Sequence, residues 1–340
     1  MLNQEKTLIF IVGNSRSGTT MMSRIVGKHP QVFSFNELHF FGELWAPDPK
    51  KKVISNTELQ LLMAKLLCIQ RDGYLTQGNP EVFFEEAGDA LREIPVDNIS
   101  PATLFQSFLM YESRQKGKLI PCEHTPGNVF YIEEILELYP QAKIINMIRD
   151  PRDVLLSQKR KWKRRFLGAK KIPLREAIRS KVNYHPVTIS KLWNAAVGAA
   201  EKFTDRDRVY SLRFEELLEK PEVKVREIYD FLDLSFDNSF LEVPQIGSSS
   251  ASDRPTKKGI DSNKAGNWQK GGLSSTEIFL CQQITKDLRK KYSYHSEPIN
   301  PNYLELIYSL FSLPFQLTLA LFLNFNRMSR IADTIKRRLT

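Results

Sequence analysis

The chain alternates between two hydrophobic patterns. Short, continuous apolar runs are typical of strands buried on both faces, whereas apolar residues at every third or fourth position are typical of helices. Residues 7–12 (TLIFIV) form such a run, which ends at Gly13 and predicts a central parallel strand. Residues 143–148 (KIINMI) and 209–214 (VYSLRF) predict two further strands. Because helical patterns separate these runs, we expect a parallel sheet covered by helices in a three-layer α/β fold.

Capping residues mark where several of the helices begin. Ser55 and Glu58 have the spacing of a capping box ahead of an apolar stripe. Ser100 before Pro101 is typical of an N-cap followed by a proline in the first helical turn. Helical patterns dominate from about residue 40 to 118, so we expect this segment to form a helical cap inserted into the sheet domain.

The first segment with chemistry is GNSRSGTT, residues 13–20, between the first predicted strand and a helix predicted over residues 21–28. A glycine-rich turn from strand to helix directs backbone N–H groups and the helix N-terminus at an anion. In nucleotide-hydrolysing P-loops, a Lys after the second Gly binds the β- and γ-phosphates. Thr19 occupies that position here, and the only cation of the segment is Arg16. The segment therefore predicts an anion site without the chemistry of NTP and magnesium.

The second segment is IRDPRDVLLS, residues 148–157. Arg149 follows a predicted buried strand, so we expect its guanidinium at the carboxyl edge of the sheet, where open α/β folds bind ligands. Asp150 and Asp153 are suited to cap and support the helix that follows. Ser157 lies about two turns into that helix. Arg149 and Ser157 are therefore suited to hold a phosphate by a forked cation and a hydroxyl.

Together the two segments resemble the sulfotransferases that use 3′-phosphoadenosine 5′-phosphosulfate (PAPS). In that family a PRSGTT loop cradles the 5′-phosphosulfate, and an RDPRDxxxS segment binds the 3′-phosphate. Four more segments of this chain follow the family's order: HPQVFSFNE, CEHTPGN, LRFEELLEKP and KAGNW, residues 29–37, 122–128, 212–221 and 264–268. The pattern is most similar to the tyrosylprotein and bacterial carbohydrate-type branch. The resemblance implies a P-loop NTPase-like three-layer α/β/α fold with a helical cap, PAPS as donor, PAP as product, and no metal.

The resemblance also implies roles for individual residues. Glu37 matches the general base that takes the proton of the acceptor, and His39 is the rival base. Arg16 and His124 complete the implied catalytic set, with His124 where family members often have Lys. Phe214 stands where they often have Tyr, so it lacks a hydroxyl. The residues implied in donor binding are Ser15, Arg16, Ser17, Gly18, Thr19, Thr20, Arg149, Ser157, Phe214 and Lys264.

Composition narrows the choice of partners. Lys and Arg number 49 against 39 Asp and Glu, and the net charge of +10 favours an anionic partner. Three cysteines without a CxxC pair and five histidines without ligand spacing predict no zinc site, and they fit a cytoplasmic protein. Eight basic residues fall within residues 159–171 and favour an acidic saccharide or lipid-borne acceptor. No motif accompanies them that would indicate nucleic-acid binding.

The C-terminal part has a separate character. Residues 306–325 carry no charge, and a basic segment follows them. Their number fits a bilayer span, but Pro314 and several polar residues argue against one. We favour peripheral membrane contact through residues 301–340, ahead of a helix docked on the domain or on a homodimer partner. We accordingly expect a sulfotransferase domain over residues 1–296 and a hydrophobic, basic helical tail over 297–340.

Two other functions remain open from the sequence. One is a P-loop small-molecule kinase or NTPase, against which Thr19 counts. The other is a catalytically inactive PAP-binding scaffold, which the departures at His124 and Phe214 keep open. The identity of the acceptor is not predicted, because acceptor contacts come from variable loops.

Overall fold

The computed structural model describes residues 7–45, 55–74, 78–94, 99–170, 172–247 and 252–324. Its centre is a five-stranded sheet in the order β2-β3-β1-β4-β5, in which every neighbouring pair is parallel. A separate two-stranded antiparallel ribbon joins β6 and β7. The strands are β1 (Leu8–Gly13), β2 (Val32–Ser34), β3 (Ile120–Glu123), β4 (Ala142–Ile148), β5 (Val209–Arg213), β6 (Pro244–Gln245) and β7 (Arg254–Lys258).

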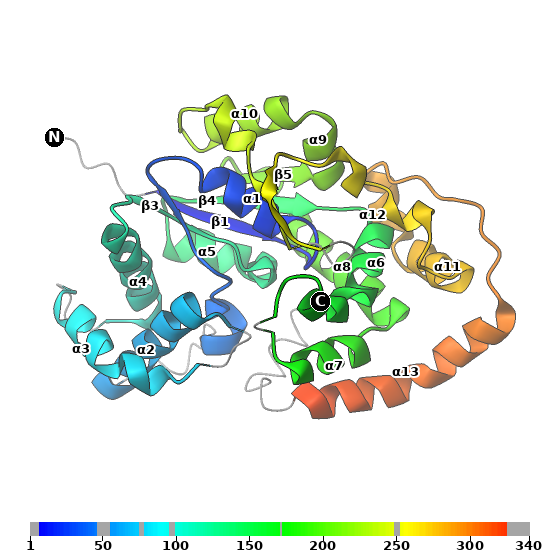
Figure 1. Ribbon diagram of the computed structural model, residues 1–340, viewed down its shortest axis with the longest axis horizontal. Helices are drawn as coiled ribbons and strands as arrows, with labels where there is room; N and C mark the ends of the chain where they lie inside the picture. Colours follow the sequence, from blue (N-terminus) through cyan, green and yellow to red (C-terminus); the bar gives the residue numbers. More distant parts are fainter. Residues whose placement is uncertain are drawn as a thin grey trace.

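Helices cover both faces of the sheet (Figure 1). The α-helices are α1 (Thr19–Val26), α2 (Asn56–Asp72), α3 (Phe84–Arg92), α4 (Pro101–Gln115), α5 (Ile132–Leu138), α6 (Pro151–Lys159), α7 (Leu174–Val182), α8 (Pro186–Glu201), α9 (Phe214–Glu219), α10 (Pro221–Phe231), α11 (Ser275–Ile284), α12 (Lys286–Lys291) and α13 (Tyr303–Asn324). Shorter helical segments are η1 (Phe40–Leu44), η2 (Pro80–Phe83), η3 (Pro126–Tyr131), η4 (Lys161–Phe166), η5 (Asn238–Leu241), η6 (Ser262–Lys264) and η7 (Asn267–Lys270).

The predicted α/β fold with a central parallel sheet is confirmed, and β1 explains its apolar run. Leu8 and Phe10 belong to the core on one face, with α2, α4, α5 and α8, whereas Ile9 and Ile11 belong to the core on the other, with α1, α9 and α10. Every residue of β1 is buried. A strand covered on both faces has no position where a polar side chain reaches water, so its sequence is apolar throughout.

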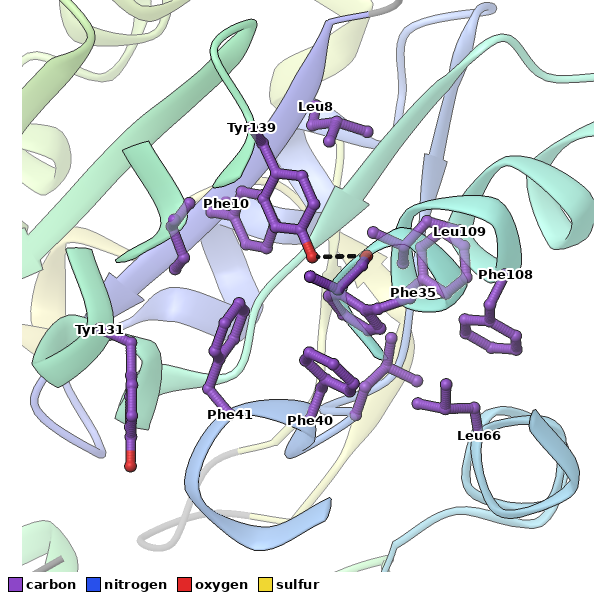
Figure 2. Close-up of a cluster of buried hydrophobic side chains, with 14 of the residues drawn as sticks. Leu8, Phe10, Phe35, Phe40, Phe41, Leu66, Phe108, Leu109, Tyr131 and Tyr139 are labelled. Carbon is purple, nitrogen blue, oxygen red and sulfur yellow. Dashed lines mark hydrogen bonds between the residues drawn. The ribbon is translucent and has the colours of Figure 1, made fainter. Parts of the chain in front are cut away.

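The first of these cores also anchors the segment that follows β2. Phe35 and Phe40 lie on either side of Glu37 in the sequence, and both are buried against α4 (Figure 2). Phe40 stacks on Phe105 of α4 with ring centroids 4.0 Å apart. Beyond them, the hydroxyl of Tyr139 donates to the carbonyl of Ala102 over 3.0 Å. Aromatic packing therefore holds the backbone around Glu37 in place.

Local signals located several elements correctly, and two elements were missed. Ser55 closes a capping box with Glu58, and Ser100 accepts from the backbone N–H of Thr103, as the sequence predicts. Strand β3 was not predicted, because Pro121 stands inside it and proline is depleted in interior strands. The β6–β7 ribbon was not predicted either, because its strands carry no apolar pattern.

We predict that Gly13→Ala destabilises the fold. Gly13 has φ +141°, and a Cβ there would lie 2.3 Å from the carbonyl oxygen of Met147 on β4. The expected loss in free energy of unfolding is about 2 kcal/mol or more, measured by urea unfolding.

The matched control is Gly198→Ala in the interior of α8. An added Cβ at Gly198 meets nothing within 4 Å, so this change should raise the free energy of unfolding by about 0.5–1 kcal/mol. Equal stability of the two variants would contradict the steric argument.

Candidate active site

The loop between β1 and α1 lies at the carboxyl edge of the sheet. Gly13 ends β1, and Gly18 precedes α1 in the left-handed conformation (φ 99°) without a side-chain cap. Arg16 also has a positive φ, 77°, which is uncommon for a residue other than glycine. Because α1 begins here without a side-chain cap, its first N–H groups have no capping partner, which is the arrangement that suits an anion.

Two arginines from different segments meet at this loop. Arg149 follows β4, and its Nη1 donates to the carbonyl oxygen of Arg16 over 3.2 Å. The Nε of Arg16 donates to the Oγ of Ser157 on α6 over 2.9 Å. A second contact runs from Nη2 of Arg149 to the carbonyl of Lys264, 2.9 Å away. The structure thus brings four of the sequence-predicted donor-binding residues into one cluster.

The guanidinium of Arg149 is held from several sides. It lies over the ring of Phe214, 4.6 Å from the centroid, and 3.6 Å from a carboxylate oxygen of Asp153. Phe214 is buried and its ring also packs on Gly18, where a Cβ would lie 2.4 Å from Cδ2. Phe214 therefore supports the loop and the arginine together. Its missing hydroxyl leaves this packing intact.

Some donors of the cluster have no partner. Among the residues that the structure describes, the buried Oγ of Ser17 and the buried Nε of Arg149 make no hydrogen bond. Burying such groups without a partner costs free energy. Arg16 is also under electrostatic strain: burial, and then the positive charge of Arg149, lower its pKa to about 10. An anion with several acceptor oxygens fits this group of residues, because it would accept hydrogen bonds from the unpaired donors and offset the positive charge of the two arginines.

Helix α6 ties the C-terminal loop to the same edge. Asp153 accepts from the backbone N–H groups of Gly266 and Trp268, each over 2.9 Å. Trp268 is buried, and the guanidinium of Arg152 lies 3.9 Å from its ring centroid. The KAGNW segment is therefore fixed beside Arg149. The pKa of the Lys264 side chain is lowered by burial and by the positive charge of Arg149.

Glu37 lies on the segment between β2 and η1. Its carboxylate lies 3.6 Å from Nε2 of His39, whose Nδ1 lies 3.3 Å from a carboxylate oxygen of Glu43. The side chain of Glu37 is 40% exposed. Desolvation alone would raise its pKa, but the hydrogen bond and charge of His39, with the charge of Lys161, lower it to about 2. Glu37 is thus ionised at neutral pH, and its negative charge also acts on Arg16.

His39 is held between two carboxylates and packs against Tyr74, with ring centroids 3.9 Å apart and the rings tilted by 30°. Burial opposes its protonation, but the bonds to Glu37 and Glu43 outweigh burial and raise its pKa to about 9. Both ring nitrogens face carboxylates, so neither is directed at an open space. This distinguishes His39 from Glu37, which was its rival in the sequence.

His124 lies deeper than the sequence suggested. It is 7% exposed, and its Nδ1 is 3.1 Å from the Oγ of Ser23. Burial lowers the pKa of His124, so it is neutral at pH 7. Its neighbour Glu123 is buried and accepts from the backbone N–H groups of Leu38 and Thr125, which positions the segment that carries Glu37.

Lys161 is a further candidate for the site, and the sequence did not single it out within the basic run. It lies at the start of η4. Its ammonium makes no ion pair or hydrogen bond with any residue in the described ranges. Burial, then the charge of Arg16, lower its pKa, while the charge of Glu37 raises it. Because α6 ends at Lys159, no helical spacing in the sequence places Lys161 beside Ser157.

Fold and site together define an α/β domain in which a strand–loop–helix turn carries a cluster of arginines and unpaired donors. The model of a family described as the sulfotransferase family matches residues 9–238. The chain therefore belongs to the sulfotransferase family. The resemblance stated from the sequence motifs is confirmed.

Several relatives carry related names. A Mycobacterium bovis protein named omega-hydroxy-beta-dihydromenaquinone-9 sulfotransferase is 28% identical over 256 residues, which cover 68% of this chain and 64% of that protein. A putative protein-tyrosine sulfotransferase of Caenorhabditis briggsae is 26% identical over 252 residues, covering 71% and 70%. An uncharacterized Aquifex aeolicus protein is 24% identical over 272 residues, covering 78% of this chain and 31% of that protein. The chain thus spans less than two thirds of the mycobacterial and Aquifex relatives.

A solved structure supports the fold. The sulfotransferase domain from the curacin biosynthetic pathway matches with a TM-score of 0.50 at 19% identity, covering 85% of this chain and 98% of that one.

We predict a pH-dependent contribution of His39 to stability. Its pKa in the folded protein, about 9, lies above its ordinary value of 6.5. The stabilisation is therefore complete below about pH 6.5 and is lost as the pH rises through 9. In urea unfolding, the difference in free energy between wild type and His39→Asn should be largest at pH 6 and should shrink towards pH 9.5. His295→Asn, at an exposed histidine, is the control. A difference for His39→Asn that stays constant with pH would refute the ion-pair interpretation.

Proposed function

We propose that the protein transfers a sulfuryl group from PAPS to a hydroxyl of an acceptor, without a metal. The observation that best supports this is the convergence of Arg16 and Arg149 at the loop, with donors of the same cluster left unpaired. PAPS has two separate anionic groups, a 5′-phosphosulfate and a 3′-phosphate. A two-part cationic cluster is suited to such a donor.

In this proposal the cluster divides between the two anionic groups. Arg16 and the loop that follows it hold the 5′-phosphosulfate and neutralise the leaving group. Arg149 and Ser157 hold the 3′-phosphate, and Lys264 adds positive charge at the edge of the site. The loop residues assigned to donor binding are Ser15, Ser17, Gly18, Thr19 and Thr20, and Phe214 supports them from below.

Glu37 is proposed as the general base. It accepts the acceptor's proton as the acceptor oxygen bonds to sulfur and the bond from sulfur to the bridging phosphate oxygen breaks, leaving PAP. Its accessibility and ionised state support this role, and the engagement of both nitrogens of His39 argues against His39. A pKa of about 2 makes a weak base. The negative charge of the donor beside Arg16 would raise that pKa towards a useful range.

Lys161 is proposed to stabilise the charge that develops on the transferred group. The sequence assigned a catalytic role to His124, which replaces a Lys of the family. Because His124 is neutral and buried, it serves as a hydrogen-bonding group rather than a cation. Lys161 supplies an ammonium whose charge acts on both Arg16 and Glu37. A preorganised cation near developing negative charge is an effective form of catalysis.

The acceptor side is proposed to lie under the helical cap of residues 40–118. Tyr74, just after α2, packs against His39, and Phe40 packs on α4, so these helices border the carboxylates. The names of the relatives indicate two acceptor types, a lipid hydroxyl and a tyrosine hydroxyl. For this chain we propose a hydroxyl acceptor of either kind, or a saccharide. The three buried, free cysteines support a reducing, cytoplasmic location.

We predict that Glu37→Gln lowers turnover of PAPS by ~10²-fold or more and leaves PAP binding nearly unchanged. The amide keeps the shape of the side chain but cannot accept the proton. PAPS consumption is measured with a panel of lipid, tyrosine and saccharide acceptors, and PAP binding by thermal shift. Wild-type turnover in this variant would eliminate Glu37 as the base.

We predict that Arg149→Ala removes the stabilisation of the protein by PAP. PAP at 100 times its dissociation constant should stabilise the wild type by ~2.7 kcal/mol without metal, and the variant should lose this gain. Stabilisation only by ATP with magnesium would indicate a kinase. Stabilisation by PAP without turnover on any acceptor would favour an inactive scaffold.

We predict that Lys161→Met lowers kcat by about 10-fold or more, with little change in PAP binding, because it removes a cation and keeps the length of the side chain. Lys170→Met is the control, since it neutralises an exposed lysine of the same basic run. Equal kcat in the two variants would rule out a role for Lys161.

A further inference from the structure

Helix α13 turns its polar side towards the domain and its apolar side towards solvent, which is the opposite of an ordinary surface helix. It runs along the edge of the molecule beside α7 (Figure 1). A surface helix normally turns its apolar face inward and its polar face to water. In α13 the residues that are not exposed follow a helical stripe and are mostly polar or small: Glu305, Leu306, Ser309, Ser312, Leu313, Gln316, Ala320 and Asn324.

Hydrogen bonds hold this polar stripe on the domain. The hydroxyl of Ser274 donates to Glu305 over 2.6 Å, at the start of the helix. The ring of buried His185 lies 3.1 Å from the backbone carbonyl of Ser309. Further along, the amide of Gln316 donates to the carbonyl of Tyr184 over 3.0 Å.

The far end of the helix is held in the same way. The side-chain amide of Asn324 donates to the oxygen of Asn183 over 3.0 Å. These bonds span α13 from its first turn to its last, so the helix has a defined rotation about its axis. Turning the apolar side towards the domain would break all of them.

Apart from Thr318, the exposed side of α13 is apolar from its first turn to its last. Phe311, Phe315 and Phe322 are 75%, 77% and 78% exposed. Ten further exposed positions are also apolar or aromatic: Tyr303, Leu304, Ile307, Tyr308, Leu310, Pro314, Leu317, Leu319, Leu321 and Leu323. An exposed apolar face of this extent marks a surface that is covered in the working protein.

The surroundings of this face are basic. Helix α7, which contacts α13, exposes Leu174 and Ile178 together with Arg175 and Lys181. The sequence after α13 contains five basic residues and one acidic residue in positions 327–338. Apolar side chains flanked by cations are the composition of helices that lie in the headgroup region of anionic membranes.

We propose that α13 docks the protein on an anionic lipid surface, with the helix lying in the plane of the membrane and its apolar side in the acyl boundary. The length and composition of α13 also fit a span, but the polar stripe is bonded to the domain along the whole helix, and a spanning helix would have to leave those partners. The basic surroundings favour a lipid surface over an apolar groove of another protein. This docking goes beyond the proposed reaction and does not depend on it.

The test is co-sedimentation of the full chain with vesicles of phosphatidylcholine, with and without phosphatidylglycerol. Wild type should sediment with vesicles, and more strongly with the anionic ones. The triple variant Phe311→Ser/Phe315→Ser/Phe322→Ser should show at least a ~10-fold lower partition coefficient, because three exposed aromatic side chains no longer enter the lipid. The control is Val82→Ser/Leu119→Ser/Val223→Ser, which removes three exposed apolar side chains from elsewhere.

Three results would overturn the proposal. The first is a wild-type protein that binds no vesicle. A homodimer seen by light scattering would then indicate that a second copy of the chain covers the α13 face. The second is unchanged vesicle binding by the α13 variant. The third is a wild type that resists alkaline extraction from membranes, which would indicate a span. PAP stabilisation is measured on every variant, so that a failure of membrane docking is distinguished from a failure of the proposed reaction.

Discussion

Two guanidinium groups of like charge meet where β1 and β4 end, and much of the surrounding structure serves to hold them there. The carbonyl of Arg16 accepts from Arg149, so the loop itself ties the two arginines together. Phe214, Asp153 and Ser157 then supply an aromatic face, a negative charge and a hydroxyl around them. Asp153 and Ser157 both lie on α6, whereas Phe214 begins α9, so two helices supply these contacts. The sheet order places β4 beside β1, which makes the meeting possible.

The position and the charge of Glu37 depend on contacts other than those that hold the two arginines. Glu37 lies on a segment whose neighbours are anchored in an aromatic core, and the buried Glu123 fixes that segment through backbone N–H groups. The position of Glu37 thus comes from packing, while its charge state comes from His39. The charge of Glu37 therefore acts on Arg16, although the two residues lie on different segments of the chain.

The sequence predicted those parts of the molecule that depend on local rules. The apolar run of β1, the capping box at Ser55 and the glycine-rich loop each follow from residues close together in the chain. Strand β3 was not predicted, because Pro121 lacks the N–H that a strand ladder uses. The segment is extended only through its pairing with β1 and β2. The burial of His124 and the approach of Lys161 depend on how distant elements pack, which no spacing encodes. The polar stripe of α13 was visible in principle, at Glu305, Ser309, Ser312 and Gln316, but its direction required the domain beside it.

Arg16 combines two requirements that conflict within one residue. Its backbone adopts a conformation that glycine accepts more easily than any other residue, while its side chain supplies the cation that the loop needs. The stability of the fold and the proposed anion binding therefore favour different residues at one position. Replacing Arg16 with glycine would relax the backbone and remove the cation in a single step.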